Sequence, residues 1–103
     1  MIRSTVRMQI RPGLDSEFEA AWRQVAAEAG TAPGNLRQTL VRDAAPHTYL
    51  VVSDWVSKAA FRAFERSPEQ DRLTAPLRAL RESADMSVNE IVVHFDGVRE
   101  ENR

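Results

Sequence analysis

Hydrophobic and polar residues alternate near the start of the chain and then change to a helical spacing. The alternation over residues 5–10 is typical of a half-buried strand. The next stretch predicts a helix with Asp15 as its N-cap and Gly30 at its end, because its apolar residues recur every three or four positions. These apolar residues are Phe18, Ala21, Trp22, Val25, Ala26 and Ala29.

The middle of the chain predicts a hairpin followed by a second helix. Residues 35–43 and 49–55 have the composition of strands. The short turn 44–47 lies between them, so we expect an antiparallel pair. Ser57 is placed to cap a helix by accepting a backbone N–H that has no partner within that helix. This helix carries three apolar residues on one face, namely Ala60, Phe61 and Phe64.

The last third of the chain predicts two short helical pieces and a final strand. A capping box at residues 67–70 begins the first piece. Pro76 is expected to break the helix, so that Thr74 caps a separate last helix. The apolar run in residues 86–95 predicts the last strand, and residues 97–103 form a charged tail.

The order of these elements is β-α-β-β-α-β, which predicts a ferredoxin-like α+β fold with an antiparallel sheet. Helices on one face of such a sheet leave the other face polar when it contacts water. The third and fourth predicted strands are instead apolar on both sides. We therefore expect a homodimer in which the sheets of two copies cover each other.

Composition limits the function classes. The chain has 103 residues, enough for one domain, and its net charge of −1 gives no general attraction to nucleic acid or to an anionic membrane. It has no cysteine, which excludes disulfides and thiolate metal sites. No apolar run is long enough to span a bilayer, and no signal peptide is recognisable, so a cytoplasmic protein is the default expectation.

Motifs for bound cofactors are also missing. The two histidines, His47 and His94, are far apart and have no acidic residue or histidine at ligand spacing. No glycine-rich phosphate loop follows a strand. The sequence therefore predicts neither a metal nor a nucleotide cofactor.

Several features together resemble one family. Besides the size and the order of elements, they are Pro33-Gly34 before the second strand and the pattern Asp54-x-x-Ser57-x-x-Ala60-Phe61 around Trp55. Over residues 4–96 the chain resembles the antibiotic biosynthesis monooxygenase (ABM) domains. This resemblance implies a dimeric α/β barrel with a single domain in residues 1–103. It also implies an activity found in the family, which includes cofactor-free oxygenases of aromatic polyketides, haem-degrading enzymes and members with no known activity.

The resemblance carries over to single residues only in part. Trp55 matches the family's tryptophan at a strand end. Phe61 stands where the anthrone oxygenases have a tyrosine, and Val51 where they have an asparagine. The haem-degrading branch has an asparagine on the first strand, where residues 6–8 are Val-Arg-Met, and a histidine after the central helix, where this chain has none.

The candidate site residues follow from the pattern and from the resemblance. Trp55 and His94 are the first candidates for catalysis, followed by Arg37 and Asn35. For Trp55 the alternative is packing, and for His94 it is a buried structural histidine, although an imidazole suits proton abstraction near neutral pH. Aromatic and methionine side chains suit the lining of a flat ligand's pocket, and Tyr49 could be either wall or interface. The predicted lining is Trp22, Phe61, Phe64, Met8, Met86 and Tyr49.

The resulting functional expectation is a cofactor-free monooxygenase that oxidises an anthrone-like aromatic polyketide with O₂. A deprotonated anthrone is a delocalised carbanion that can reduce O₂ directly, so the protein need supply only an apolar slot, hydrogen bonds and a base. One alternative is a dimer of the same fold that binds a small molecule or assists a cyclase without redox chemistry. Haem degradation is a third possibility, which the missing histidine disfavours.

Overall fold

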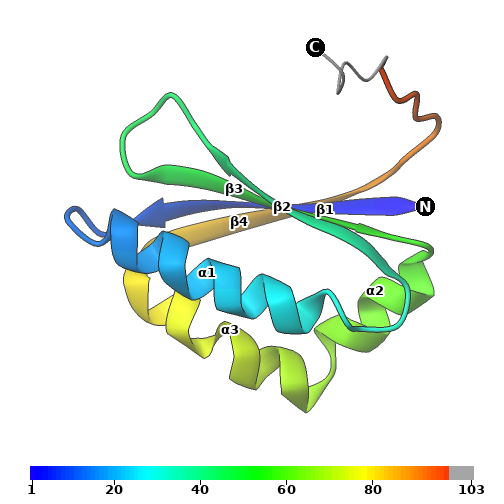
Figure 1. The fold of residues 1–103 in the computed structure, drawn as a ribbon, viewed down its shortest axis with the longest axis horizontal. Helices are drawn as coiled ribbons and strands as arrows, with labels where there is room; N and C mark the ends of the chain where they lie inside the picture. Colours follow the sequence, from blue (N-terminus) through cyan, green and yellow to red (C-terminus); the bar gives the residue numbers. More distant parts are fainter. Residues whose placement is uncertain (98–103) are drawn as a thin grey trace, which may run out of the picture.

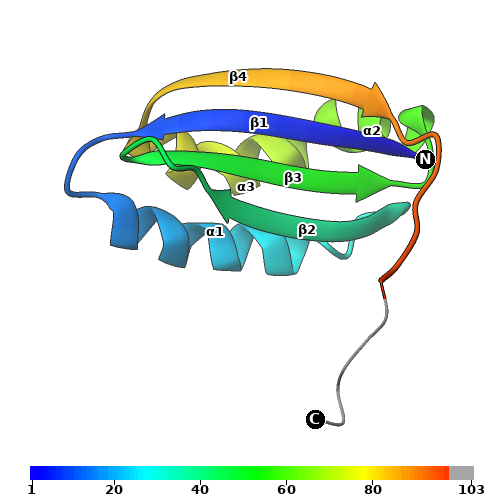
Figure 2. The same ribbon diagram turned by 90° about the horizontal axis from the view of Figure 1, so that it is seen from above.

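Three helices cover one face of a four-stranded antiparallel sheet (Figure 1). This computed structural model describes residues 1–97. Seen from the uncovered side, the strands lie in the order β2-β3-β1-β4 with the helices behind them (Figure 2). The elements are β1 (Ile2–Ile10), α1 (Asp15–Ala29), β2 (Asn35–Arg42), β3 (Thr48–Trp55), α2 (Lys58–Glu65), α3 (Pro68–Leu80) and β4 (Arg81–Glu90). The predicted ferredoxin-like α+β fold is confirmed.

The core lies between the sheet and the helices and has two parts. The larger part joins inward-facing strand residues to one side chain each of α1 and α3. The smaller part surrounds Trp55 at the other end of the sheet, with Ile2 and Phe61. The buried members of the larger part are Met8, Ile10, Phe18, Tyr49 and Leu77. No helix within residues 1–97 is long and apolar enough to cross a membrane.

Two of the predicted helix caps are present. The Ser57 hydroxyl accepts the backbone N–H of Ala60 at 3.1 Å, and the Ser67 hydroxyl accepts that of Gln70 at 3.1 Å. Each bond satisfies an N–H that has no acceptor inside its helix. The prediction for Asp15 is wrong, because Asp15 is the first residue of α1 and its carboxylate binds side chains of the β2–β3 hairpin and β3 instead.

Pro76 does not divide α3, contrary to the prediction from sequence. The helix runs through it, and the Thr74 hydroxyl donates to the carbonyl of Gln70 at 2.9 Å instead of capping a new helix. A proline at this position removes one backbone hydrogen bond. Leu77 and Leu80 follow Pro76 and pack into the core, so their burial offsets this loss.

The last strand is displaced from its predicted position. β4 is the polar stretch Arg81–Glu90, and the apolar residues 91–95 lie beyond it. The reason is that β1 is too short to pair with residues beyond Glu90. Ile2, the first residue of β1, pairs with Glu90, and one further hydrogen bond joins the Ile91 N–H to the Met1 carbonyl at 2.9 Å. Residues 92–95 are left without a strand to pair with, and Val92 and Phe95 are 90% and 87% exposed.

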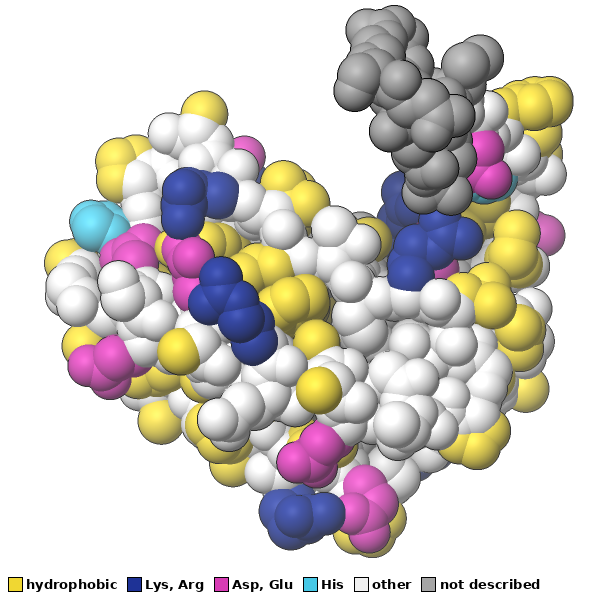
Figure 3. Space-filling model, in the orientation of Figure 1, with side chains coloured by type: hydrophobic (Ala, Val, Ile, Leu, Met, Phe, Trp, Pro, Cys, Tyr) yellow, Lys and Arg dark blue, Asp and Glu magenta, His cyan; other side chains and the backbone are white. Residues whose placement is uncertain are grey.

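The face of the sheet opposite the helices, which we call the open face, is partly apolar. β3 contributes Leu50 and Val52 to it, and β2 contributes Val41. Hydrophobic side chains reach the surface above the sheet, to the right of the β2–β3 hairpin (Figure 3). The prediction that the fourth strand is also apolar on both sides is wrong, because on the open face β4 carries Ser83, Asp85, Ser87 and Asn89.

Candidate functional site

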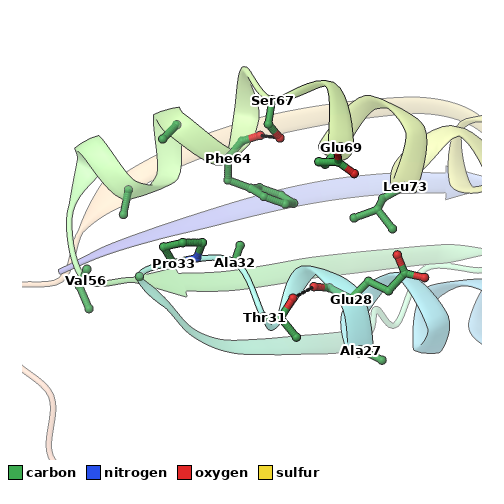
Figure 4. Close-up of a pocket in the computed structure, with 13 residues that line it drawn as sticks. Ala27, Glu28, Thr31, Ala32, Pro33, Val56, Phe64, Ser67, Glu69 and Leu73 are labelled. Carbon is green, nitrogen blue, oxygen red and sulfur yellow. Dashed lines mark hydrogen bonds between the residues drawn. The ribbon is translucent and has the colours of Figure 1, made fainter.

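The helical side of the molecule contains two hollows large enough for a ligand. The first, which we call the outer groove, has a volume of about 850 Å³ and lies between the end of α1 with its following loop and the helices α2 and α3. In Figure 4 the Phe64 ring lies on one side of it, with Ala32 and Pro33 opposite. Its other lining residues are Ala27, Glu28, Thr31, Gly34, Val56, Ala60, Ala63, Ser67, Glu69 and Leu73.

The polar groups of the outer groove are occupied locally. The Thr31 hydroxyl donates to the Glu28 carbonyl at 2.7 Å and the Ser67 hydroxyl to the Phe64 carbonyl at 2.7 Å. The Glu69 carboxylate binds Arg72 at 2.6 Å. Few polar groups therefore remain to orient a ligand in this groove.

The second hollow, which we call the inner cavity, has a volume of about 260 Å³ and lies between the sheet and the helices. Strands, α1, α2 and α3 all contribute to its lining, which mixes apolar and polar side chains as ligand sites do. The lining residues are Ser4, Val6, Met8, Trp22, Val25, Ala29, Gln38, Val51, Ser53, Trp55, Phe61, Phe64, Glu65, Gln70, Thr74, Leu77, Arg78, Arg81, Ala84 and Met86.

An aromatic wall closes one end of the inner cavity. The Trp55 side chain is 1% exposed, and its ring centroid lies 5.9 Å from that of Phe61 and 5.1 Å from that of Phe64. These separations are typical of favourable aromatic contacts. Phe64 lines both hollows, so its ring separates the inner cavity from the outer groove.

A short hydrogen-bonded pair lies beside this wall. The Trp55 indole Nε1–H donates to the Ser53 Oγ at 2.9 Å. Ser53 and Trp55 are two positions apart on β3 and therefore point to the same side of the sheet. Among the described residues the Ser53 hydroxyl donates no hydrogen bond of its own, so it can donate to a ligand oxygen in the cavity.

The structure brings six of the ten predicted site residues together around the inner cavity. They come from five elements, and the wall residues stand at the junction of β3 and α2, where the strand-end tryptophan precedes a helix with an aromatic face. The six are Trp55, Trp22, Phe61, Phe64, Met8 and Met86.

Arg37 and Asn35 lie elsewhere. Arg37 points to the open face, where it binds the Asp54 carboxylate at 3.3 Å together with Arg3 at 2.8 Å. The Asn35 side chain donates to the Asp54 carbonyl at 3.4 Å. The carboxylate of Asp54 is buried, and the hydrogen bond and charge of Arg3, with the charge of Arg37, hold its pKa below the usual value.

His94 and Tyr49 also lie outside the inner cavity. His94 follows β4 in the exposed segment and its Nε2 lies 2.8 Å from the Asp96 carboxylate. Tyr49 is buried against Phe18, with ring centroids 4.9 Å apart. The expectation that His94 lies among apolar neighbours in the last strand is wrong, because β4 ends at Glu90.

The Tyr49 hydroxyl belongs to a separate polar cluster between α1 and the hairpin. It donates to Glu19 at 2.6 Å and lies 3.2 Å from Asp15, which also contacts His47 at 2.8 Å. Arg42 binds the same Glu19 carboxylate at 2.6 Å. Burial, with the bond to Glu19, raises the pKa of Tyr49 to about 12, so this phenol stays protonated and holds α1 to the hairpin.

Eight polar residues of the cavity lining were not among the predicted site residues, and Ser53, Gln38, Glu65 and Arg81 are four of them. Ser53 and Gln38 occupy positions that face the helices in strands with alternating polar and apolar residues. This pattern could have identified them from the sequence, because a polar residue at an inward position needs a partner or a ligand. Glu65 and Arg81 stand at the ends of α2 and α3. Only the packing of the helices on the sheet brings these two ends to the same cavity.

The cavity lining contains no histidine within the described part of the chain. Residues 1–97 also contain no cluster of three or more histidine, cysteine, aspartate or glutamate side chains that could hold a metal ion.

These features define a class of protein: a small α+β domain that encloses a partly polar aromatic cavity between an antiparallel sheet and its helices. Within this class the chain belongs to the antibiotic biosynthesis monooxygenase family, whose sequence profile matches residues 1–75. The family resemblance seen in the sequence is thereby confirmed. No curated protein matches the chain in sequence.

Solved structures with the same fold are similar over almost their whole length. One is a variant of SnoaB, a cofactor-independent oxygenase from Streptomyces nogalater. Its comparison with this chain gives a TM-score of 0.82 and 24% sequence identity, over 93% of this chain and 97% of that chain. MhuD, solved with two manganese protoporphyrin IX molecules per active site, has a TM-score of 0.79 and 24% identity over 94% of this chain and 100% of that chain. A third structure, of an antibiotic biosynthesis monooxygenase, has a TM-score of 0.76 and 17% sequence identity over 90% of this chain and 100% of that chain.

Proposed function

We propose that the chain is a cofactor-independent monooxygenase that oxidises a fused-ring aromatic substrate of the anthrone class with O₂. The observation that carries this proposal is the inner cavity of about 260 Å³, with an aromatic wall and a hydrogen-bond donor beside it. Membership of the ABM family and the shared fold of SnoaB, a cofactor-independent oxygenase, support it.

The substrate supplies the electrons in this reaction. Removal of a proton from the anthrone CH₂ group gives an enolate whose carbanion form transfers electrons to O₂. A peroxide then forms at that carbon, and its O–O bond breaks as the second hydrogen leaves. One oxygen atom becomes the new quinone carbonyl and the other leaves as water.

The chain's residues act on the enolate in this scheme. Trp55, Phe61 and Phe64 form the wall for the flat ring system and exclude water. The Ser53 hydroxyl, polarised by the Trp55 N–H, donates a hydrogen bond to the developing enolate oxygen. Glu65 is the carboxylate that lines the cavity and serves as the proton acceptor.

Oxygen uptake with the model anthrone dithranol tests the proposal. We expect the protein, treated with a chelator to remove metal, to consume one O₂ per anthrone at a rate well above the spontaneous oxidation. The anthraquinone product is followed by its absorbance. A rate equal to the spontaneous one would contradict the oxygenase proposal.

Two substitutions test whether Ser53 and Trp55 act together as a hydrogen-bond relay to the enolate. We expect Ser53→Ala and Trp55→Phe each to lower kcat by about 10- to 100-fold, since each removes part of one hydrogen-bond relay to the enolate. Because the relay acts as a unit, the double variant should be little slower than either single variant. Ser16→Ala, at an exposed position of α1, is the control and should keep the wild-type rate. Full additivity of the two effects would show that the pair does not act as a relay.

One observation favours a second function. Val51 and Phe61 line the inner cavity without a polar group, so the cavity offers fewer contacts to substrate oxygens than a site with polar side chains at these positions. A dimer of this fold that binds an aromatic molecule or assists a cyclase needs no such contacts. Saturable binding of dithranol under anaerobic conditions, with no O₂ uptake above background in air, would support this function over the oxygenase.

A further inference from the structure

Arg81 lines the inner cavity at the end opposite the aromatic wall. Trp55 pairs with Ile2 and Arg81 with Ile10, eight positions further along β1. At roughly 3.3 Å per residue, these backbone positions lie about 26 Å apart. The flexible arginine side chain covers part of that distance, so the lining has an aromatic end and a cationic end.

No carboxylate compensates the charge of Arg81 within the described part of the chain. Its guanidinium forms no hydrogen bond and no ion pair with residues 1–97, and its nitrogens are not fully buried. Arg78, the other arginine of the lining, differs in this respect, because it binds the Asp71 carboxylate at 3.3 Å and the Thr74 hydroxyl at 2.5 Å.

The surroundings of Arg81 disfavour its positive charge. The side chain is half-buried. Burial, and to a lesser extent the neighbouring charge of Arg78, lower the pKa of its guanidinium. An arginine remains charged even so, and a partly desolvated charge without a partner is unfavourable. A ligand that brings an anionic group to this end of the cavity would give the guanidinium a partner.

We infer that the inner cavity is built for a fused-ring aromatic carboxylate, whose ring system lies against Trp55, Phe61 and Phe64 and whose carboxylate pairs with Arg81. Arg81 then determines specificity by distinguishing an acid from its neutral analogue. The planar guanidinium fork can bind a carboxylate through two parallel hydrogen bonds. This inference rests on the proposed use of the inner cavity for an aromatic ligand.

Binding of two fluorescent probes tests the inference without any turnover. The probes are anthracene-2-carboxylate and its neutral analogue anthracene-2-methanol, titrated into the full chain. We expect the wild type to bind the carboxylate about 10-fold more tightly than the alcohol. Arg81→Gln should weaken carboxylate binding by about 10-fold and change alcohol binding by less than about 2-fold, and Arg81→Lys should keep part of the preference.

Arg72→Gln is the matched control, since Arg72 is an exposed arginine of α3, the helix that Arg81 follows, and it does not line the inner cavity. It should leave both affinities unchanged. Equal binding of the two probes by the wild type, no binding of either, or an equal loss for both probes in Arg81→Gln would overturn the inference. If Arg81→Gln does not fold, as judged by circular dichroism, the wild-type ratio and its decrease with added salt still decide the question.

The two proposals can fail separately. A clear carboxylate preference without O₂ uptake would remove the oxygenase function and keep the role of Arg81. Rapid O₂ uptake from neutral dithranol with no preference for the carboxylate probe would do the reverse.

Discussion

Gly34 lies in the loop before β2, in close contact with the start of α2. Its φ is +85°, and a Cβ atom at this position would lie 2.6 Å from the Ala60 Cβ and 3.0 Å from the Val56 Cγ2. Only glycine meets both the backbone conformation and the space at this point. The Pro33-Gly34 pair, noticed in the sequence as part of the family pattern, therefore has a physical reason in this chain.

We expect Gly34→Ala to lower the free energy of unfolding by about 3 kcal/mol, because it adds a steric clash to an unfavourable φ. Gly13→Ala is the matched control. Gly13 has φ +87°, and a Cβ atom added there would meet nothing within 4 Å, so this change should cost only the conformational term of about 1 kcal/mol. Urea unfolding measures both. Equal costs for the two variants would mean that the clash with α2 is relieved elsewhere.

The Arg3–Asp54–Arg37 cluster on the open face predicts a specific pH dependence. Arg3, and then Arg37, lower the pKa of Asp54 in the folded protein, whereas an unperturbed aspartate has a pKa of about 3.9. The stabilisation from these contacts is therefore present above about pH 4 and is lost as the pH falls toward the folded-state pKa.

Asp54→Asn should remove this contribution. At pH 7 we expect the free energy of unfolding to fall by about 2 kcal/mol. This is less than the roughly 3 to 5 kcal/mol of a fully buried pair, since both arginines are about half exposed. Below pH 4 the variant and the wild type should converge. Urea unfolding between pH 3 and pH 7 measures the difference, and a constant gap across this range would show that the charge of Asp54 is not its source.

At the residue scale, the sequence predicted the apolar part of the candidate site better than the polar part. Trp55, Phe61 and Phe64 stand out by size and spacing wherever the strand and helix lie. The polar residues depend on exact positions instead. The prediction for His94 assumed a last strand that reaches Phe95, whereas β4 ends at Glu90. Ser53 is a candidate because of its hydrogen bond with Trp55, which the sequence does not contain.

At the element scale, α3 shows how tertiary packing overrides a local signal. Pro76 is an unfavourable residue in a helix interior, and from the sequence it predicted a break. The leucines that follow it have their place in the core only if the helix continues. The local sequence around Pro76 does not contain that information, because the residues that these leucines contact belong to β1 and α1.

Pro76→Ala should therefore stabilise the protein. The substitution restores an N–H that can bond to the Arg72 carbonyl and removes the steric conflict of the ring, worth about 3 kcal/mol in a helix interior. The greater freedom of the unfolded chain offsets up to about 1 kcal/mol of this. We expect a net gain of about 2 kcal/mol in urea unfolding.

The control for this change is Ala79→Gly, an exposed position of the same helix, which should lose about 1 kcal/mol. A loss of stability in Pro76→Ala would indicate that the proline ring makes a favourable contact of its own. It lines a shallow depression between α1 and α3 with Leu73 and Arg72, which is where such a contact would lie.

The position of β4 also depends on tertiary structure, in this case on pairing with β1. The apolar run 91–95 has the composition of a strand, while the observed strand Arg81–Glu90 is largely polar. Register decided the outcome, since α3 ends at Leu80 and the chain begins to pair with β1 at once. Composition predicts that a segment suits a sheet, but only a partner with free backbone groups makes it a strand.

At the scale of the whole molecule, apolar side chains outside the two hollows reach the surface at the open face and in the segment 91–97. On the open face Val41 is exposed and Leu50 and Val52 are partly exposed, and the segment 91–97 carries exposed valines and a phenylalanine. Both lie on the side of the sheet away from the helices (Figure 1). A domain of this size buries a limited fraction of its surface, and apolar patches of this kind mark interfaces.

The expected interface is therefore a second copy of the chain, with the two open faces in contact around a two-fold axis. Val52→Glu tests this, because in the dimer it would place a charge without a partner in the interface. We expect it to raise the dissociation constant of the dimer at least about 100-fold, so that low micromolar protein sediments as a monomer.

Val56→Glu is the matched control, since Val56 is 49% exposed beside the outer groove on the helical side, and it should leave the dimer intact. Sedimentation velocity distinguishes the two masses. A wild type that is already monomeric at low micromolar concentration would contradict the dimer, and a dimer that survives Val52→Glu but not Val56→Glu would place the contact on the helical face instead.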